Sequence, residues 1–296
     1  FTTVAAAGGM AVSQAVAYQS QMQNVGTLLD GDIKGKLQSM SKELKQVSID
    51  TGASTSDLTD GLYQVVSAFG ESSESVKQLE IAAKAAKAGN ATTTDSVNLL
   101  SAVTKGYGDT SAEAMQKASD LAFMTVKLGQ TSFPELAASM GQVVPLASTL
   151  KVSQEELFGA MSTLTGVTGG TAEVTTQLKA TMQSFLSPST EMEKALKGMG
   201  YASGAAALES EGLGGILTKL MESVDGDTVA FANLFSSVEA KNAVLALAGS
   251  QAENFAEKTD AMREASGAAE AAFKTQTASV AAMAAKMKNA GSVMLT

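Results

Sequence analysis

Ser54-Thr55-Ser56-Asp57 is the first of four short segments that set where helices begin in this chain. In each segment, a residue with a side-chain hydroxyl is followed three positions later by a carboxylate. The hydroxyl can accept a hydrogen bond from a first-turn amide, and the carboxylate can bond back to the amide of the capping residue. The other three segments are Thr92-Thr93-Thr94-Asp95, Ser132-Phe133-Pro134-Glu135 and Ser153-Gln154-Glu155-Glu156. Each segment therefore predicts the first turn of an α-helix.

Apolar residues at helical spacing follow these caps, as Leu58, Leu62 and Val65 do after the first one. The starts of the four segments are separated by 38, 40 and 21 residues. One helix with its connection takes about 20 residues, and a hairpin of two helices takes about 40. The spacing therefore predicts an all-α protein whose body is made of stacked helical hairpins.

The same periodicity predicts helices outside the capped segments, and no part of the sequence alternates as a β-strand does. Pro145 should kink or shorten the helix that it interrupts, and Gly166–Gly170 should break the chain. Residues 201–215, which are rich in small residues, are predicted to form a loop. We expect helices over 1–25, 33–49, 54–69, 75–88, 94–107, 112–128, 132–149 and 153–165, a helix from Val174 to Phe185 that Pro188 stops, a short helix capped by Thr190, and helices over 214–224, 228–237 and 238–248.

The C-terminal part of the chain has an Ala/Met-rich apolar pattern. From Gln251 onward, these residues recur at steps of three and four, which predicts one helix of about 40 residues and about 60 Å. An isolated helix of this composition gains little from propensity, so it must fold back on the body or pair with copies of itself. We predict that it is an assembly element. The assembly seam consists of Phe255, Met262, Ala269, Val280, Met283 and Met287.

We expect three parts within a piece of a longer protein: two leading helices over 1–50, a helical core body over 51–250, and the long C-terminal helix over 251–296. A split of the body into two lobes at Gly166–Gly170 is the alternative. The composition does not shift across these glycines, which favours one body.

Composition argues against an enzyme. The chain contains no cysteine and no histidine, so a disulfide framework, a thiolate metal site and a Ser-His-Asp arrangement are all excluded. The net charge is −9, and Arg263 is the only arginine, which disfavours sequence-specific nucleic-acid binding. An acidic surface instead lets a polyanion pass without sticking. No apolar run is long enough to span a bilayer.

Three kinds of motif suggest chemistry but fit structural roles better. Asp30-Gly31-Asp32 and Asp225-Gly226-Asp227 lack the further ligands of a calcium loop, and they are typical of turns and caps. The acidic pairs Glu155/Glu156 and Glu191/Glu193 lie in predicted first helical turns, where carboxylates are favourable. Gly212–Gly215 lacks the lysine and hydroxyl of a phosphate loop. We therefore predict no catalytic residues, no metal and no cofactor.

Three ordered segments carry a resemblance. The first joins Leu128-Gly-Gln-Thr-Ser-Phe-Pro-Glu-Leu to Leu150-Lys-Val-Ser-Gln-Glu-Glu-Leu-Phe-Gly, the second runs from Glu173 through Leu186-Ser-Pro-Ser-Thr-Glu-Met to Tyr201, and the third pairs Gly215-Ile-Leu-Thr-Lys-Leu with Leu234-Phe-Ser-Ser-Val-Glu-Ala. In this order they resemble the core region of phage tail tape-measure proteins, also called minor tail proteins. The resemblance extends from about Tyr18 to Thr296. Departures occur at Val174–Thr176, Lys179 and Phe235–Ser236, where many members have Ala-Gly-Thr, Arg and Phe-Gly.

The resemblance implies a structural role without an active site. Such a protein sets tail length while the tube polymerises around it, and it leaves the tube ahead of the DNA at infection. The implied partners are copies of itself, with three expected, together with the tail tube and tail-tip proteins. The implied location is the lumen of the tail tube in the virion, after assembly in the host cytoplasm. The alternative is a membrane-active channel component that helps the genome across the host envelope. A cell-wall hydrolase is the third possibility, but no residue set supports it.

Overall fold

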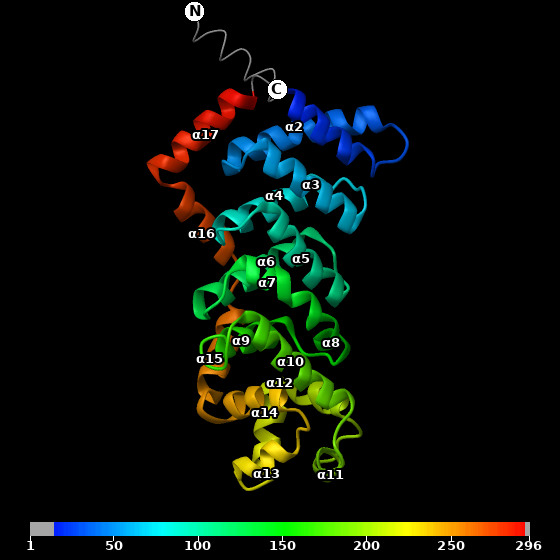
Figure 1. The fold of residues 1–296 in the computed structure, drawn as a ribbon, viewed down its shortest axis with the longest axis vertical. Helices are drawn as coiled ribbons and strands as arrows, with labels where there is room; N and C mark the ends of the chain where they lie inside the picture. The colour runs from blue at the N-terminus through cyan, green and yellow to red at the C-terminus, as the bar shows by residue number, and fades with distance from the viewer. Residues whose placement is uncertain (1–14, 294–296) are drawn as a thin grey trace, which may run out of the picture. The chain divides into compact units, whose positions relative to one another are not determined.

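The computed structural model describes residues 15–293, and the regular elements within them are all helical (Figure 1). The all-α prediction is therefore confirmed. Residues 1–14, which hold the first half of the helix expected over 1–25, lie outside the described residues, as do 294–296. The described part of that helix covers 15–26.

The chain forms two compact units, whereas the sequence predicts one body. The first unit comprises the described residues up to Ser101, residues 110–119 and the described residues from Ala269 onward; the second comprises 102–109 and 120–268. Helices α5 (Thr93–Tyr107) and α6 (Ala112–Leu128) contribute residues to both units. Because helices run through the division, no linker or change of composition marks it. The glycine-rich break at Gly166–Gly170 lies inside the second unit.

Helices of both units lie largely where the sequence places them. The first unit holds α2 (Ile33–Thr51), α3 (Thr55–Phe69), α4 (Ser75–Ala88), α16 (Ala268–Thr277) and α17 (Val280–Val293). The second unit holds α7 (Phe133–Ser139), a 3-10 turn η1 (Met140–Gln142), α8 (Val144–Thr149), α9 (Gln154–Leu164), α10 (Thr171–Leu186), α11 (Thr190–Gly198), α12 (Gly204–Glu222), α13 (Thr228–Asn233), α14 (Val238–Leu245), a π-helical turn η2 (Ala246–Ser250) and α15 (Ala252–Arg263).

The predicted caps begin four of these helices. The hydroxyl of Ser54 accepts from the amide of Asp57 at 3.2 Å, and the hydroxyl of Ser153 accepts from the amide of Glu156 at 3.2 Å. Thr92 and Asp95 form the complete reciprocal box, in which the threonine amide donates to the carboxylate at 3.3 Å and the aspartate amide to the hydroxyl at 3.0 Å. Ser132 caps α7 in the same way. The residues that carry the repeat therefore act locally as predicted.

Two of the cap carboxylates also reach the next repeat. Asp57, at the start of α3, accepts from the backbone amide of Thr93 at 3.2 Å and from its hydroxyl, at the start of α5. Glu135, at the start of α7, accepts from the hydroxyl of Thr171 at 3.4 Å, at the start of α10. The hydroxyls of Thr131 and Thr171 share a further hydrogen bond of 2.7 Å. Helix N-termini about one hairpin apart in sequence are therefore bonded together within each unit.

Pro145 and the glycines act as the sequence predicts. The helix expected over 132–149 is divided into α7, the 3-10 turn and α8, and Pro145 stands in the first turn of α8, where its missing amide costs no helical bond. The break at Gly166–Gly170 separates α9 from α10.

Two local predictions are wrong. Residues 204–211 are helical rather than a loop, because Ser203 caps them by accepting from the amide of Ala206 at 3.1 Å and the following alanines favour helix. The helix kinks only at Gly212, where φ is +71°. The short helix α11 is capped by Ser189 rather than Thr190, since the extended backbone after Pro188 aims the Ser189 hydroxyl at the amide of Met192.

The prediction of one long C-terminal helix is also wrong. The described residues from 251 to 293 form three helices, α15, α16 and α17, of 12, 10 and 14 residues. The first break contains Gly267, whose φ of +81° is left-handed, and its amide donates to the buried carboxylate of Asp120 at 2.9 Å. The second break falls at Ala278–Ser279. The steps of three and four continue across both breaks, so periodicity alone did not show them.

Each unit has its own apolar core. Leu58, Leu62 and Val65 of α3 are fully buried in the first unit, and Leu157 and Met161 of α9 are fully buried in the second. These are the stripes that the sequence predicts.

Candidate functional site

The first two seam residues are core residues of the second unit. Phe255 and Met262 of α15 are 3% and 2% exposed. α15 packs against α9, and the two backbones come close at Gly159, where an added Cβ would stand 3.1 Å from the Cα of Thr259. The ammonium of Lys258 donates to the carbonyl of Ser162 at 2.8 Å. Partial burial lowers the pKa of Lys258. α15 is therefore folded back on its own unit.

The third seam residue, Ala269, is buried in the first unit at the start of α16. Glu270 of the same helix forms ion pairs with Lys84 at 3.3 Å and Lys274 at 3.5 Å. Although burial alone lowers the pKa of Lys84, its bonds to Glu80 and Glu270 raise the pKa above its ordinary value. The Lys84 ammonium also lies 5.8 Å from the ring centre of the buried Phe273. These contacts fix α16 to α4.

The last seam residues lie on α17, which packs on α2. The amide of Asn289 donates to the carbonyl of Ala53 at 2.9 Å, which anchors the helix at the junction of α2 and α3. Met283 and Met287 are 58% and 77% exposed, so they lie on the outer face of this helix. The side chain of Val280 lies outside the described residues.

The structure therefore does not bring the six seam residues together on one surface. Phe255, Met262 and Ala269 are used within the chain, whereas Met283 and Met287 remain available for a partner. Since these two methionines are four residues apart on a helix, they share one face.

The other residues that the sequence singles out have structural roles. Asp32 caps α2 by accepting from the amide of Gly35 at 3.0 Å, and Asp227 caps α13 by accepting from two amides. Glu155, Glu191 and Glu193 lie in first helical turns. Within the part of the chain that the structure describes, no group of three or more acidic side chains is arranged to hold a metal ion.

The glycine-rich segment 212–215 contacts a carboxylate of the chain itself. The amide of Gly214 donates to Glu156 at 3.3 Å, and the second oxygen of Glu156 accepts from Ser153 at 3.1 Å. An added Cβ at Gly212 would stand 2.4 Å from the same carboxylate, so the kink in α12 fits closely around it. Glu156 therefore occupies the place beside residues 212–215 where a phosphate loop would hold its phosphate.

A charged cluster beside this kink was not predicted. Glu211 accepts from Tyr201 at 2.5 Å and from Lys219 at 2.8 Å, and Lys219 also donates to the Tyr201 hydroxyl at 3.1 Å. The bonds from Lys219 and Tyr201 lower the pKa of Glu211 from 4.5 to about 2. Tyr201 lies before α12 and Glu211 lies ten residues later within it, a separation that helical spacing does not single out.

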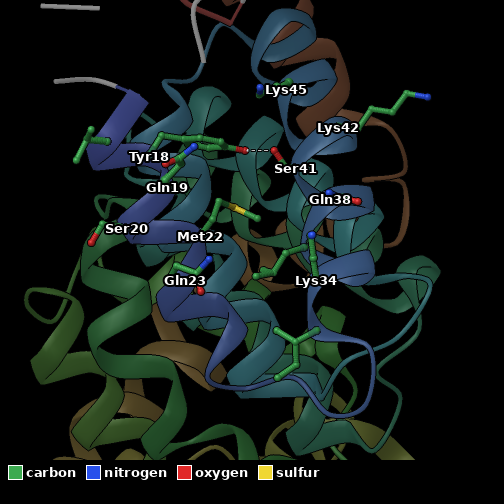
Figure 2. Close-up of a pocket in the computed structure, with 13 residues that line it drawn as sticks. Tyr18, Gln19, Ser20, Met22, Gln23, Lys34, Gln38, Ser41, Lys42 and Lys45 are labelled. Atoms are coloured by element: carbon green, nitrogen blue, oxygen red, sulfur yellow. Dashed lines mark hydrogen bonds between the residues drawn. The ribbon is translucent and has the colours of Figure 1, made fainter. Parts of the chain in front are cut away.

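A groove between the helix over 15–26 and α2 was also not predicted (Figure 2). It is lined by apolar residues, by uncharged glutamines and serines, and by Lys34, Lys42 and Lys45. In the sequence, nothing distinguishes these lysines from lysines on an ordinary solvated helix face. Separately, none of the described helices is both long enough and apolar enough to cross a membrane.

Comparison with known proteins identifies the family. Residues 41–235, about two thirds of the chain, match the family described as phage-related minor tail protein. The chain belongs to this family. The match includes all four cap segments and ends just before α14, so the repeated body is the part that defines membership. As a member of a phage tail protein family, the chain is a component of the virion.

A curated relative aligns with this minor tail protein over most of the chain. The chain is 26% identical over 268 residues to a protein of Clostridium phage phiCD119 described as "Probable tape measure protein". The alignment covers 86% of this chain but only 28% of that protein, so the chain spans less than a third of its relative's length. No solved structure matches the chain.

Proposed function

We propose that this chain is a structural segment of a tape-measure protein, which sets tail length during tube assembly and is released ahead of the DNA at infection. The observation that carries the proposal is the minor tail family match over residues 41–235, joined to the alignment with a tape measure protein over most of the chain. The all-helical fold fits this role, because helices add length at a fixed rise of about 1.5 Å per residue.

The charge of the chain supports a location in the tail tube lumen. A net charge of −9 disfavours adhesion to DNA that follows the protein through the same tube. The composition supports a role without catalysis, since the chain has no histidine and no cysteine. Buried hydroxyls such as Thr163 and Thr175 donate to carbonyls of their own helices at 2.8 Å, so they are occupied as structural groups.

We further propose that copies of the chain contact one another through the outer face of α17, and that the tube and tail-tip proteins are the other partners. Met283 and Met287 supply this face, since exposed methionines adapt well to a partner surface. Deleting 251–296 would not test this contact, because it also removes Phe255 and Met262 from a core. The matched test compares Met283→Gln/Met287→Gln with wild type by light scattering; an unchanged oligomer would contradict the contact.

Labelling of intact and emptied virions tests the location and the release. We expect the lysines of this chain to be protected from a membrane-impermeant amine reagent in intact tails, and the chain to be absent from tails after DNA ejection. Lysines on the outer surface of the tail should be labelled in both samples and serve as the control. Labelling of this chain in intact virions, or its retention after ejection, would contradict the proposal. A liposome leakage assay tests the alternative role as a membrane-active channel component.

A further inference from the structure

The groove between the helix over 15–26 and α2 has an apolar floor and an apolar edge. Tyr18, Met22 and Leu37 are buried beneath it, and Ile33 and Val16 line its opposite ends, 40% and 60% exposed. Its volume is about 1090 Å³. That is at the upper end of the roughly 300–1,000 Å³ of ligand pockets, so the groove is large enough for a turn of polypeptide.

The rim of this groove is positively charged. Lys34, Lys42 and Lys45 line it, and no carboxylate does (Figure 2). Lys45 lies 5.6 Å from the ring centre of Tyr18, whereas Lys34 and Lys42 have no ion-pair partner among the described residues. By contrast, Lys36 of the same helix pairs with Glu71 at 2.6 Å. In a chain of net charge −9, the unpaired ammonium groups of Lys34 and Lys42 favour an anionic partner.

The second unit carries a surface with the opposite charge. Residues 220–240 contain four carboxylates, Glu222, Asp225, Asp227 and Glu239, and no lysine or arginine. Val229 and Val238 in this stretch are each 68% exposed, although both are large apolar residues. α13 stands at one end of the second unit in Figure 1, and the stretch that includes it is therefore accessible within that unit.

The turn that leads into α13 has a defined shape. The carboxylate of Asp227 accepts from the amides of Val229 and Ala230 at 2.8 Å and 3.0 Å. Gly226 adopts a φ of +76°, and Asp225 a φ of +54°. A turn that is already ordered loses little freedom when it binds, which favours docking.

We propose that the acidic turn Glu222–Val229 of one copy docks in the lysine-rimmed groove of a second copy. Val229 would enter beside Ile33, and the carboxylates would face Lys34 and Lys42. The two surfaces differ, so the contact is heterologous: it links copies head to tail and closes into a ring only if the rotation between copies allows it. The contact uses other residues than the α17 face, and it does not depend on the proposed role in tail length.

Reciprocal charge reversal tests the contact on the purified 1–296 chain. The groove variant is Lys34→Glu/Lys42→Glu, and the turn variant is Glu222→Lys/Asp225→Asn, which leaves the Asp227 cap intact. Lys127→Glu/Lys194→Glu, on exposed residues elsewhere, makes the same change in charge as the groove variant and is the control. Circular dichroism confirms that each variant is folded.

In sedimentation velocity at low salt, we expect wild type and control to associate with increasing concentration. Each of the two reversed variants should associate at least about tenfold more weakly, because like charges then face one another. A mixture of the two variants should associate more strongly than either variant alone, because the groove variant keeps an intact turn and the turn variant keeps an intact groove.

The proposal is overturned if wild type stays monomeric at high concentration and low salt, or if both variants associate as wild type does. It is also overturned if the groove variant loses binding to phosphatidylserine vesicles while wild type is monomeric in solution. That result would assign the lysines to a membrane surface. None of these outcomes changes the expected protection of the chain in intact tails, so the two proposals fail separately.

Discussion

Replacing Asp57 by alanine should destabilise the first unit far more than a helix cap normally would. Asp57 is the acidic residue of the first cap segment, but its carboxylate bonds to the amide and hydroxyl of Thr93, which is 1% exposed. Asp95 is the equivalent residue of the second segment, and it bonds only to Thr92 within its own box. The two aspartates therefore form a matched pair that differs in whether the carboxylate joins two repeats.

The magnitude follows from the bonds that each substitution removes. Two bonds to a partly exposed carboxylate contribute about 1.5 kcal/mol each, and the loss leaves a buried amide without a partner. The helix dipole adds about 0.5 kcal/mol, and the better helix propensity of alanine offsets about 0.6 kcal/mol. Asp57→Ala should therefore cost about 3 kcal/mol. Asp95→Ala, which loses an exposed local cap, should cost about 1 kcal/mol.

Urea unfolding followed by circular dichroism measures both costs, and hydrogen exchange localises them. The Thr93 amide and the first turn of α5 should exchange faster in Asp57→Ala, while α9 and α10 of the second unit should be unaffected. Equal costs for the two substitutions would refute the idea that cap carboxylates bond one repeat to the next.

Three further predictions concern the second unit. Ser132→Ala should cost about 1 kcal/mol by loss of one cap, whereas Leu136→Asp, which buries a charge, should cost several times more in thermal melts; equal melting temperatures would be inconsistent with the hairpin packing. Gly159→Ala should loosen α15, because the new Cβ would stand 3.1 Å from the Cα of Thr259, and exchange over 252–263 should rise, with Gly166→Ala as the unaffected control. Because the pKa of Glu211 is lowered from 4.5 to about 2, its contribution is present above pH 4.5 and is lost as pH falls toward 2; Glu211→Gln should flatten the acid limb of the stability curve, and an unchanged limb would rule this out.

The sequence predicts the features that depend on nearby residues. The cap segments, the interruption at Pro145 and the buried stripe from Leu58 to Val65 all rest on interactions within one helix or its first turn, and all are confirmed. The bond from Asp57 to Thr93 spans 36 residues, and nothing in local spacing distinguishes it from a reciprocal cap.

The errors have the same origin. The C-terminal pattern keeps its apolar steps across Gly267, but the chain turns there because a left-handed glycine can donate to Asp120, 147 residues away. The seam consequently contains three residues that are buried in their own chain. The groove was not predicted because its lysines line a groove only when the helix over 15–26 lies beside α2.

Tail length is the measurement that tests the proposed function most directly. In the parent phage, the gene segment for these 296 residues is either deleted or duplicated, and tails are measured by electron microscopy. As one continuous helix the segment would span about 440 Å at 1.5 Å per residue. Because it folds as helical hairpins, we predict shorter tails on deletion and longer tails on duplication, each by less than this value and by equal amounts. Tails of wild-type length in both phages would contradict a role in setting length.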